Sequence, residues 1–218
     1  MNLEIITNVR HQDLSLIARC HRKAFPRALS TAMGQMYCEK MLEWYISDSR
    51  TFIFYLRTNG DCIGYCGGLI FDGIHPGGSA SSMIQYSFHA AVKAILLRPW
   101  LFFHPEFIRK YRLVLKNVWR KLLKWTGKPY KALPPANIPP HAGLVVIGVS
   151  PEHQGKGVGG ILLQEFENQA KSRGYNLLRL TVLQTNTQAI KAYQKNGWVI
   201  TETKGNSVAM EKVLEKND

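Results

Sequence analysis

Hydrophobic and polar positions follow regular periods along the first seventy residues of the chain. Apolar residues recur at helical spacing in two segments and form short β-branched or aromatic runs in three others. Asn59-Gly60, between two of these runs, is a dipeptide typical of a tight hairpin turn. The pattern predicts a strand over 3–9, helices over 13–25 and 31–46, and a hairpin formed by strands 51–57 and 62–71.

Residues 73–140 interrupt this pattern before the next strand begins. Apolar positions predict a helix over 83–98, which Pro99 ends, and a second helix from Pro105 to about Trp125. Five prolines between 129 and 140 predict an extended return. We therefore expect a helical hairpin inserted between two strands.

A strand, a glycine loop and a helix follow one another after this insertion. The β-branched run Leu144–Ile147 predicts a buried strand, and Pro151 ends it near Val149. Six residues, Gly155–Gly160, then include four glycines, and a helical pattern continues to about Gly174. Such an arrangement presents free backbone N–H groups and a positive helix end to an anion. The sequence thus predicts a phosphate-bearing ligand at 155–160.

Three known phosphate-binding patterns compete for this loop. A P-loop is excluded because Lys156 is not followed by Ser or Thr and the spacing differs. Gly155, Gly157 and Gly160 do satisfy a dinucleotide fingerprint, but the next expected strand, 177–183, does not end in the carboxylate that this fingerprint requires. The third pattern, Q/R-x-x-G-x-G/A preceded by V-x-P, is met by Val149, Pro151, Gln154, Gly157 and Gly159.

A second motif downstream makes this third interpretation specific. Residues 186–198 read NTQAIKAYQKNGW, which is similar to N-x-x-A-x-x-x-Y-x-K-x-G-F with Trp in place of Phe. With both motifs in this order, separated by one helix and one strand, the chain resembles the GNAT superfamily of acetyl-CoA-dependent N-acetyltransferases. The close match covers about residues 144–198.

The resemblance implies a fold as well as an activity. It implies an α+β (α/β) fold with a mixed, mostly antiparallel central sheet flanked by helices, and the helical hairpin then lies between strands three and four. We expect a single acetyltransferase domain over 1–218, with a core of 1–72 and 141–218 and a basic helical insertion of 73–140. In this family the link between the first two helices, here Phe25–Thr31, forms one wall of the acceptor site.

The resemblance also implies which residues handle the acetyl donor. Acetyl-CoA is the expected donor substrate, and a primary amine the expected acceptor. The pantetheine arm is expected along the strand at Ile147–Val149, with Asn186 contacting the arm, and the amides of that strand are expected to stabilise the carbonyl oxygen. The expected cofactor-binding residues are Ile147, Gly148, Val149, Gln154, Gly155, Lys156, Gly157, Val158, Gly159, Gly160 and Asn186.

Proton transfer requires an acid and a base. Tyr193 matches the tyrosine of the family motif, and its phenol can protonate the departing thiolate. The position where some family members carry a glutamate base is Thr181, which cannot act as a base. His141, just before the central strand, is the first substitute, with His75 and Glu39 behind it. A chain of water molecules, or an amine that arrives neutral, would also serve.

The formal net charge of +13 is concentrated in the insertion. Eleven Lys and Arg lie between residues 83 and 131, against the single acid Glu106. Three roles remain open for this segment: a solvated basic face, a lid for an anionic acceptor such as a nucleotide-linked amino sugar, and contact with a membrane surface. The membrane alternative rests on the aromatic residues that accompany the cations, Trp100, Phe102, Phe103, Trp119 and Trp125. Nucleic acid is the least favoured partner, and a homodimer stays open.

Other features of the composition narrow the class of protein. Cys62 and Cys66 lie four residues apart in an expected strand, too far for a disulfide, so we expect free buried thiols and no metal. Neither a signal peptide nor a membrane span is evident, and a cytoplasmic location, with peripheral membrane contact left open, is expected. The rival function is a non-catalytic acyl-CoA-binding or membrane- or polyanion-docking module on the same scaffold.

Overall fold

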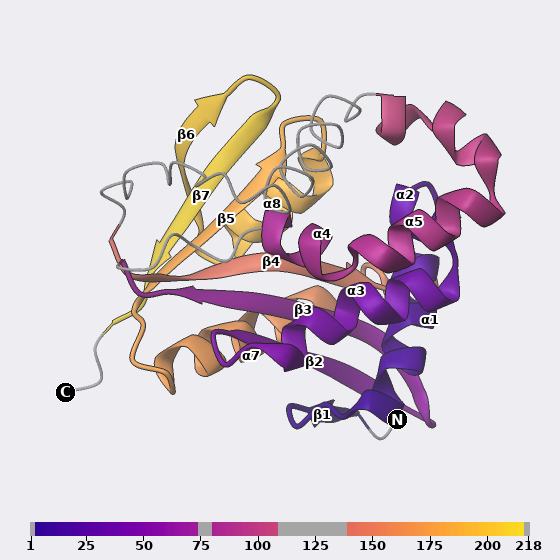
Figure 1. Ribbon diagram of the computed structural model, residues 1–218. Coiled ribbons are helices and arrows are strands. Elements are labelled where there is room, and N and C mark those ends of the chain that lie inside the picture. Colours follow the sequence, from indigo (N-terminus) through magenta and orange to yellow (C-terminus); the bar gives the residue numbers. More distant parts are fainter. Residues whose placement is uncertain (1–2, 74–79, 109–138, 216–218) are drawn as a thin grey trace.

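A seven-stranded sheet forms the centre of the computed structural model, which describes residues 3–73, 80–108 and 139–215 (Figure 1). The strand order is β1-β2-β3-β4-β5-β7-β6. Every neighbouring pair is antiparallel except β4 and β5, which are parallel. The expected mixed, mostly antiparallel sheet is confirmed. The strands are β1 Glu4–Ile6, β2 Thr51–Thr58, β3 Asp61–Phe71, β4 His141–Val149, β5 Leu177–Leu183, β6 Val199–Lys204 and β7 Ser207–Val213.

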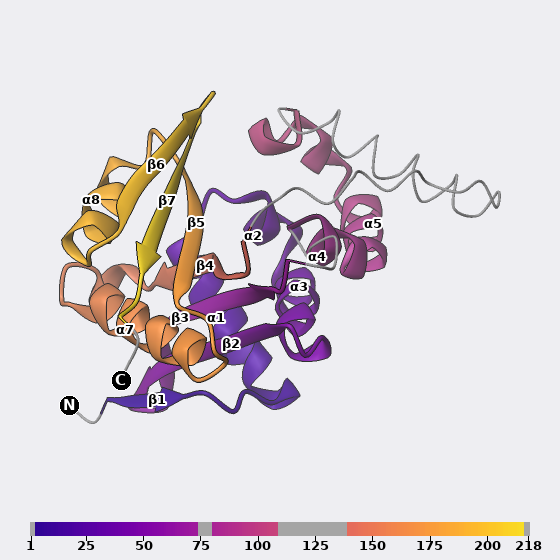
Figure 2. The same ribbon diagram turned by 90° about the vertical axis from the view of Figure 1, so that its left-hand side faces the viewer.

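Helices cover both faces of this sheet (Figure 2). One apolar core lies under α7 and α8 and includes Phe54, Leu162 and Phe166. The other lies under α1 and α3 and includes Ile17 and Leu42. Outside the insertion, the helices are η1 His11–Asp13, α1 Leu14–Ala24, α2 Leu29–Met33, α3 Gln35–Ser47, η3 Pro151–His153, α7 Val158–Lys171 and α8 Thr187–Lys195.

The hairpin turn between β2 and β3 is confirmed. Asn59 and Gly60 both have positive φ, 50° and 82°, as a two-residue turn that matches strand twist requires. The four cysteines are free and buried, as expected.

The single helix expected over 31–46 is wrong. The chain instead forms α2 and α3, which break at Gly34, where φ is +96°. A Cβ at this position would lie 2.4 Å from Nη1 of Arg98. The backbone conformation therefore requires glycine, and a larger residue would in addition displace the guanidinium of Arg98, which lies more than sixty residues away in the sequence.

The insertion begins with two helices where one was expected over 83–98. These are α4 Ala80–Tyr86 and α5 Phe88–Leu97, followed by η2 Pro99–Phe103. The break falls at Ser87, whose hydroxyl and backbone N–H both donate to the carbonyl of Met83, at 2.9 and 3.0 Å, and such a side-chain bond to the preceding turn often bends a helix. Residues 105–108 are helical, but most of the helix expected to follow, with Arg109–Lys131, and most of the proline-rich return lie outside the described residues.

Candidate functional site

Strands β4 and β5 separate part of the way along the sheet. They pair only at Ala142↔Leu178, Gly143↔Arg179 and Leu144↔Leu180, although β4 continues to Val149. On its other edge β4 stays paired with β3, with a register shift between Gly67 and Gly68. This irregularity adds one residue to β4, and such bulges bend a strand. In the described chain, the edge of β4 that faces β5 therefore has no strand partner beyond Leu144.

The glycine loop lies at the end of β4 and leads into α7. Gly155 and Gly157 have φ values of +73° and +82°, so both need glycine. The N–H groups of Gly160 and Ile161 donate to the carbonyl of Gly157. Those of Val158 and Gly159 have no backbone partner in the described chain, as expected for the first turn of a helix.

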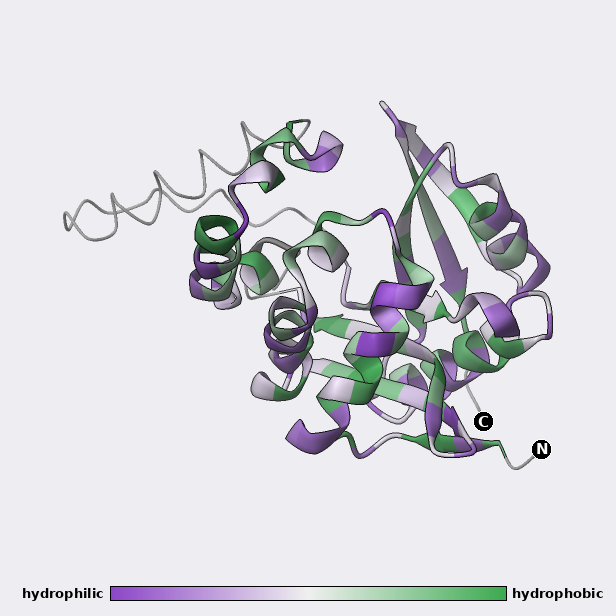
Figure 3. Ribbon diagram, turned by 90° about the vertical axis from the view of Figure 1, so that its right-hand side faces the viewer, coloured by the Kyte–Doolittle hydropathy of each residue, from purple (hydrophilic) through white to green (hydrophobic). Residues whose placement is uncertain are grey.

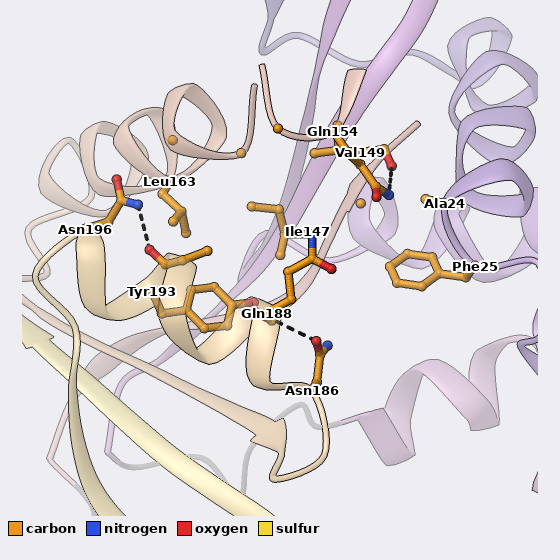
Figure 4. A pocket seen from close by; sticks show the side chains of 16 residues that line it. Ala24, Phe25, Ile147, Val149, Gln154, Leu163, Asn186, Gln188, Tyr193 and Asn196 are labelled. Atoms are coloured by element: carbon orange, nitrogen blue, oxygen red, sulfur yellow. Dashed lines mark hydrogen bonds between the residues drawn. The ribbon is translucent and has the colours of Figure 1, made fainter. Parts of the chain in front are cut away.

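A cavity of about 410 Å³ lies at the open edge of β4, between the ends of α1, α7 and α8 (Figure 4). Among the described residues that line it there is no Asp, Glu, Lys, Arg or His. The positive potential available to an anion at this point comes mainly from the backbone and from the N-terminal end of the helix. Its lining consists of Ala24, Phe25, Ile147, Gly148, Val149, Gln154, Gly155, Gly159, Gly160, Leu163, Asn186, Gln188, Ala189, Ala192, Tyr193 and Asn196.

Most of the site residues predicted from the sequence meet in this cavity. Gln154 donates its side-chain amide to the carbonyl of Val149 at 3.0 Å and so closes the end of β4. Asn186 caps α8, because its side-chain oxygen accepts from the N–H of Ala189 at 3.2 Å. Its side-chain NH₂ group is thus left for a ligand.

Three residues of the predicted loop do not line the cavity. Lys156 is exposed at the rim, and Gly157 contributes backbone conformation alone. The side chain of Val158 is buried in the core under α7 and packs near Leu162. Their contribution to a ligand site is limited to main-chain groups and, for Lys156, to a nearby charge.

Tyr193 projects from α8 into the cavity and is 7% exposed. Burial is the main reason that the pKa of its phenol rises to about 12. Its hydroxyl has no hydrogen-bond partner among the described residues. The phenol therefore keeps its proton at neutral pH and has it free to donate to a ligand.

The structure does not bring His141 to the cavity. His141 is the first residue of β4, whereas the cavity meets that strand at Ile147–Val149, six residues or about 20 Å further on. Nδ1 of His141 lies 2.8 Å from the carbonyl of Pro139, and its ring packs beside Phe71. A role as catalytic base does not fit this position. His75 lies outside the described residues.

A buried histidine that the sequence did not single out lies just behind the cavity wall. The ring of His21 packs 5.0 Å from the ring of Phe25, which lines the cavity. Nδ1 of His21 is 2.5 Å from the hydroxyl of Tyr65, and Nε2 is 2.8 Å from the hydroxyl of Ser30. Burial lowers the pKa of His21 to about 4. Since no other partner for the Tyr65 proton exists in the described chain, Tyr65 donates to a neutral imidazole, which in turn donates to Ser30.

The sequence could have indicated Phe25 but not the histidine. Phe25 falls in the expected link between the first two helices, which the structure places on the cavity opposite Tyr193. His21 appears in the sequence only as one more position on the buried side of α1. Its partners lie nine and 44 residues away, so no local pattern could have joined them.

The glycine loop and the open edge of β4 fit the phosphate and the amide-containing arm of a coenzyme A thioester. A Cβ at Gly155, Gly157 or Gly159 would meet no heavy atom within 4 Å, so the loop leaves space for a phosphate close to the backbone. The unpaired edge of β4 offers main-chain groups to an extended amide-containing arm. These features match the donor site expected from the sequence.

Comparisons with known proteins agree with this geometry. Residues 127–198 match the family model described as the acetyltransferase (GNAT) family. No curated protein matches the sequence significantly.

Several solved structures share the fold over nearly the whole chain. The PaiA N-acetyltransferase from Thermoplasma acidophilum in complex with coenzyme A has a TM-score of 0.57 and 16% identity, covering 98% of this chain and 99% of that one. The ribosomal-protein-S18-alanine N-acetyltransferase from Escherichia coli has a TM-score of 0.55 and 16% identity, covering 100% and 97%. The yncA protein from Salmonella typhimurium with its cofactor acetyl-CoA has a TM-score of 0.55 and 14% identity, covering 99% and 95%.

At such identities these structures establish the fold, while the family model covers the two motifs and the helix and strand between them. Together they confirm the resemblance first drawn from the glycine loop and the 186–198 motif. Residues 127–198 match the acetyltransferase (GNAT) family, and the whole chain has the fold of the N-acetyltransferases compared with it, so these findings support an acyltransferase enzyme.

Proposed function

We propose that the protein transfers an acetyl group from acetyl-CoA to a primary amine, by direct attack within a ternary complex. One observation carries the proposal: β4 and β5 separate beyond Leu144↔Leu180, and the glycine loop lies at the end of the β4 edge so exposed. The bound coenzyme A and acetyl-CoA named for two structures of the same fold support the choice of donor.

Each part of the donor site has a separate task in this proposal. The N–H groups of Gly155–Gly160 hold the pyrophosphate, and the open edge of β4 at Ile147–Val149 holds the pantetheine arm. Asn186 adds its side-chain NH₂ to that arm. Positioning two substrates in this way contributes about 7–11 kcal/mol to lowering the barrier, more than the roughly 2.7–4 kcal/mol of one oxyanion donor.

The chemical step forms a C–N bond and breaks a C–S bond. The amine nitrogen attacks the carbonyl carbon, whose oxygen gains charge next to the β4 amides. As the C–S bond breaks, the Tyr193 hydroxyl gives its proton to the thiolate sulfur. Because the lining of the described cavity contains no basic side chain, we propose that the amine either arrives neutral or first gives its ammonium proton to water. After the attack, the remaining surplus proton on the new amide nitrogen returns through water to the Tyr193 phenolate, which restores the acid.

The acceptor enters on the side of Phe25 and α2 in this proposal. An amino sugar, a small amine and a protein amine are the candidate acceptors, and the protein terminus named for one neighbour supports including a peptide in any test. We also propose that residues 1–218 form one domain with a core of 1–72 and 141–218, because one sheet contains strands from both parts.

Thiol release with a panel of amines tests the activity. We expect purified protein with acetyl-CoA to release free thiol faster when one class among an amino sugar, a small amine and a peptide with a free N-terminus is added. Calorimetry with coenzyme A measures donor binding separately. Coenzyme A that protects against thermal unfolding while no amine accelerates thiol release would instead support the non-catalytic acyl-CoA-binding module.

A further inference from the structure

The insertion carries an exposed apolar surface. Of the fourteen large hydrophobic side chains exposed in the described chain, seven lie between residues 92 and 108. Phe103 is 80% exposed and Leu96 is 76% exposed. Figure 3 shows strongly hydrophobic segments in α5 and in the η2 region, on the part of the molecule that projects from the sheet. We call the following set the apolar face: Val92, Leu96, Leu97, Trp100, Phe102 and Phe103.

The opposite side of the same segment is firmly packed. Ala94 and Leu101 are buried against Met33 of α2. Nη1 of Arg98 donates to the carbonyl of Met33 at 2.5 Å and so satisfies the end of α2. The hydroxyl of Tyr86 donates to Glu43 of α3 at 3.0 Å. The apolar face is therefore the outward side of α5 and η2, which pack on α2 with their other side. Such a cluster of exposed apolar side chains is unusual for a surface that remains in water.

The charge around the apolar face is positive. Lys93 is exposed on α5 among the apolar positions, and Glu106 is the only acid between 80 and 108. In the sequence that follows, residues 109–131 contain nine Lys and Arg and no acid. With a net charge of +13, a second copy of the chain would bring like charge to this surface, which disfavours self-association through it.

Aromatic side chains beside cations are the chemistry of an interfacial segment. Trp and Phe enter the boundary between headgroups and acyl chains, while Lys and Arg attract anionic headgroups. No helix in the part of the chain that the structure describes could span a bilayer. The combination fits contact with the surface of a bilayer.

We propose that the apolar face docks the protein on an anionic lipid surface. In this arrangement α5 lies in the plane of the interface, Trp100 and Phe103 enter the headgroup boundary, and Lys93 stays near the lipid phosphates. Because α5 packs on α2, the acceptor side of the cavity is held close to the lipid. The docking itself does not depend on acetyl transfer.

Vesicle cosedimentation tests the proposal. We expect the full-length protein to bind vesicles of phosphatidylcholine with an equal part of phosphatidylglycerol at low salt, and to bind pure phosphatidylcholine vesicles much less. The double variant Trp100→Ala/Phe103→Ala should lower the partition coefficient at least about tenfold, because both side chains supply apolar contact with the interface. Lys93→Glu should weaken binding and reduce its salt dependence.

A matched control uses exposed apolar residues elsewhere. Val199 and Val213, on the β6–β7 hairpin, are 60% and 75% exposed, and Val199→Ala/Val213→Ala should bind vesicles as the parent protein does. Calorimetry with coenzyme A should give the same affinity for all variants, which shows that they fold and separates docking from donor binding.

Four results would overturn the docking. The first is no binding to phosphatidylglycerol vesicles at low salt. The second is equal binding by Trp100→Ala/Phe103→Ala and its parent, which would place the lipid contact elsewhere in the chain. The third is a dimer in sedimentation velocity that this double variant dissociates, which would assign the apolar face to a second copy. The fourth is vesicle binding by the parent protein that Lys93→Glu leaves unchanged while this variant has a raised KM for an anionic amine, which would assign Lys93 to a substrate-attracting surface.

Discussion

Gly159→Ala should separate ligand binding from stability, because the structure predicts that it lowers the affinity for coenzyme A and raises the free energy of unfolding. Gly159 lies in the first turn of α7 and lines the cavity, and its φ is not positive. An added Cβ meets no heavy atom within 4 Å. Replacing glycine in a helix gains up to about 1 kcal/mol, which for a chain of this size corresponds to a rise in Tm of about 2–4 °C.

The same methyl group would occupy space next to the N–H groups of Val158 and Gly159, which have no backbone partner in the described chain. If these groups hold the pyrophosphate, the phosphate oxygens can no longer approach them closely. We expect coenzyme A affinity to fall at least about tenfold, or about 1.4 kcal/mol, measured by isothermal titration calorimetry alongside thermal unfolding.

Gly143→Ala provides the matched control. Gly143 lies in β4 near its start and does not line the cavity, and a Cβ there would come no closer than 3.5 Å to the carbonyl of Leu69. Coenzyme A affinity should stay unchanged in this variant. Undiminished affinity in Gly159→Ala would refute the assignment of the pyrophosphate to the loop, whatever the stability of the variant.

Three further predictions concern proton transfer and pH. Tyr193→Phe should lower kcat about 10²–10⁴-fold in the thiol-release assay but leave Tm and the affinity for coenzyme A unchanged, because the hydroxyl has no protein partner in the described chain; unchanged turnover would remove its acid role. The rate of the parent enzyme should rise with pH as the amine loses its proton and show no falling limb through pH 9, because the pKa of Tyr193 is raised to about 12; a rate that falls between neutrality and pH 9 would contradict Tyr193 as the acid. Burial lowers the pKa of His21 from 6.5 to about 4, so His21 binds a proton more readily in the unfolded chain. Its contribution to the free energy of unfolding is therefore complete above pH 6.5 and falls by about 3 kcal/mol as the pH drops to 4. In urea unfolding, His21→Gln should lose less stability than the parent between pH 6.5 and pH 4, whereas a variant of the exposed His11, His11→Gln, should lose as much as the parent.

Local motifs allowed the donor half of the site to be predicted from the sequence. The glycine loop and the segment from Asn186 to Tyr193 have fixed spacings, because each combines one strand end with the first turns of one helix. Such units fold into the same local geometry wherever they occur, so residues within them could be placed before the structure was known.

The errors came from contacts between distant parts of the chain. Apolar periodicity continues through Gly34, yet the helix breaks there at a positive φ, and the guanidinium of Arg98 packs at the break and donates to the carbonyl of Met33. His141 was chosen because it directly precedes the central strand, yet the cavity opens at the other end of that strand. Strand length alone, at about 3.3 Å per residue, argues against His141 once the position of the cavity is known.

The positive charge of the chain is not located in the lining of the cavity. The chain carries a net charge of +13, but the described lining of the donor cavity has no Lys or Arg, and its anion site consists mainly of main-chain N–H groups. A site of this kind recognises a diphosphate by geometry and tolerates change elsewhere in the sequence. Most of the excess cations lie, in the sequence, within the insertion. The described start of the insertion packs on α2 through α5, and Arg98 donates to the carbonyl of Met33, so the docking proposed above would bring the α2 side of the enzyme to an anionic surface.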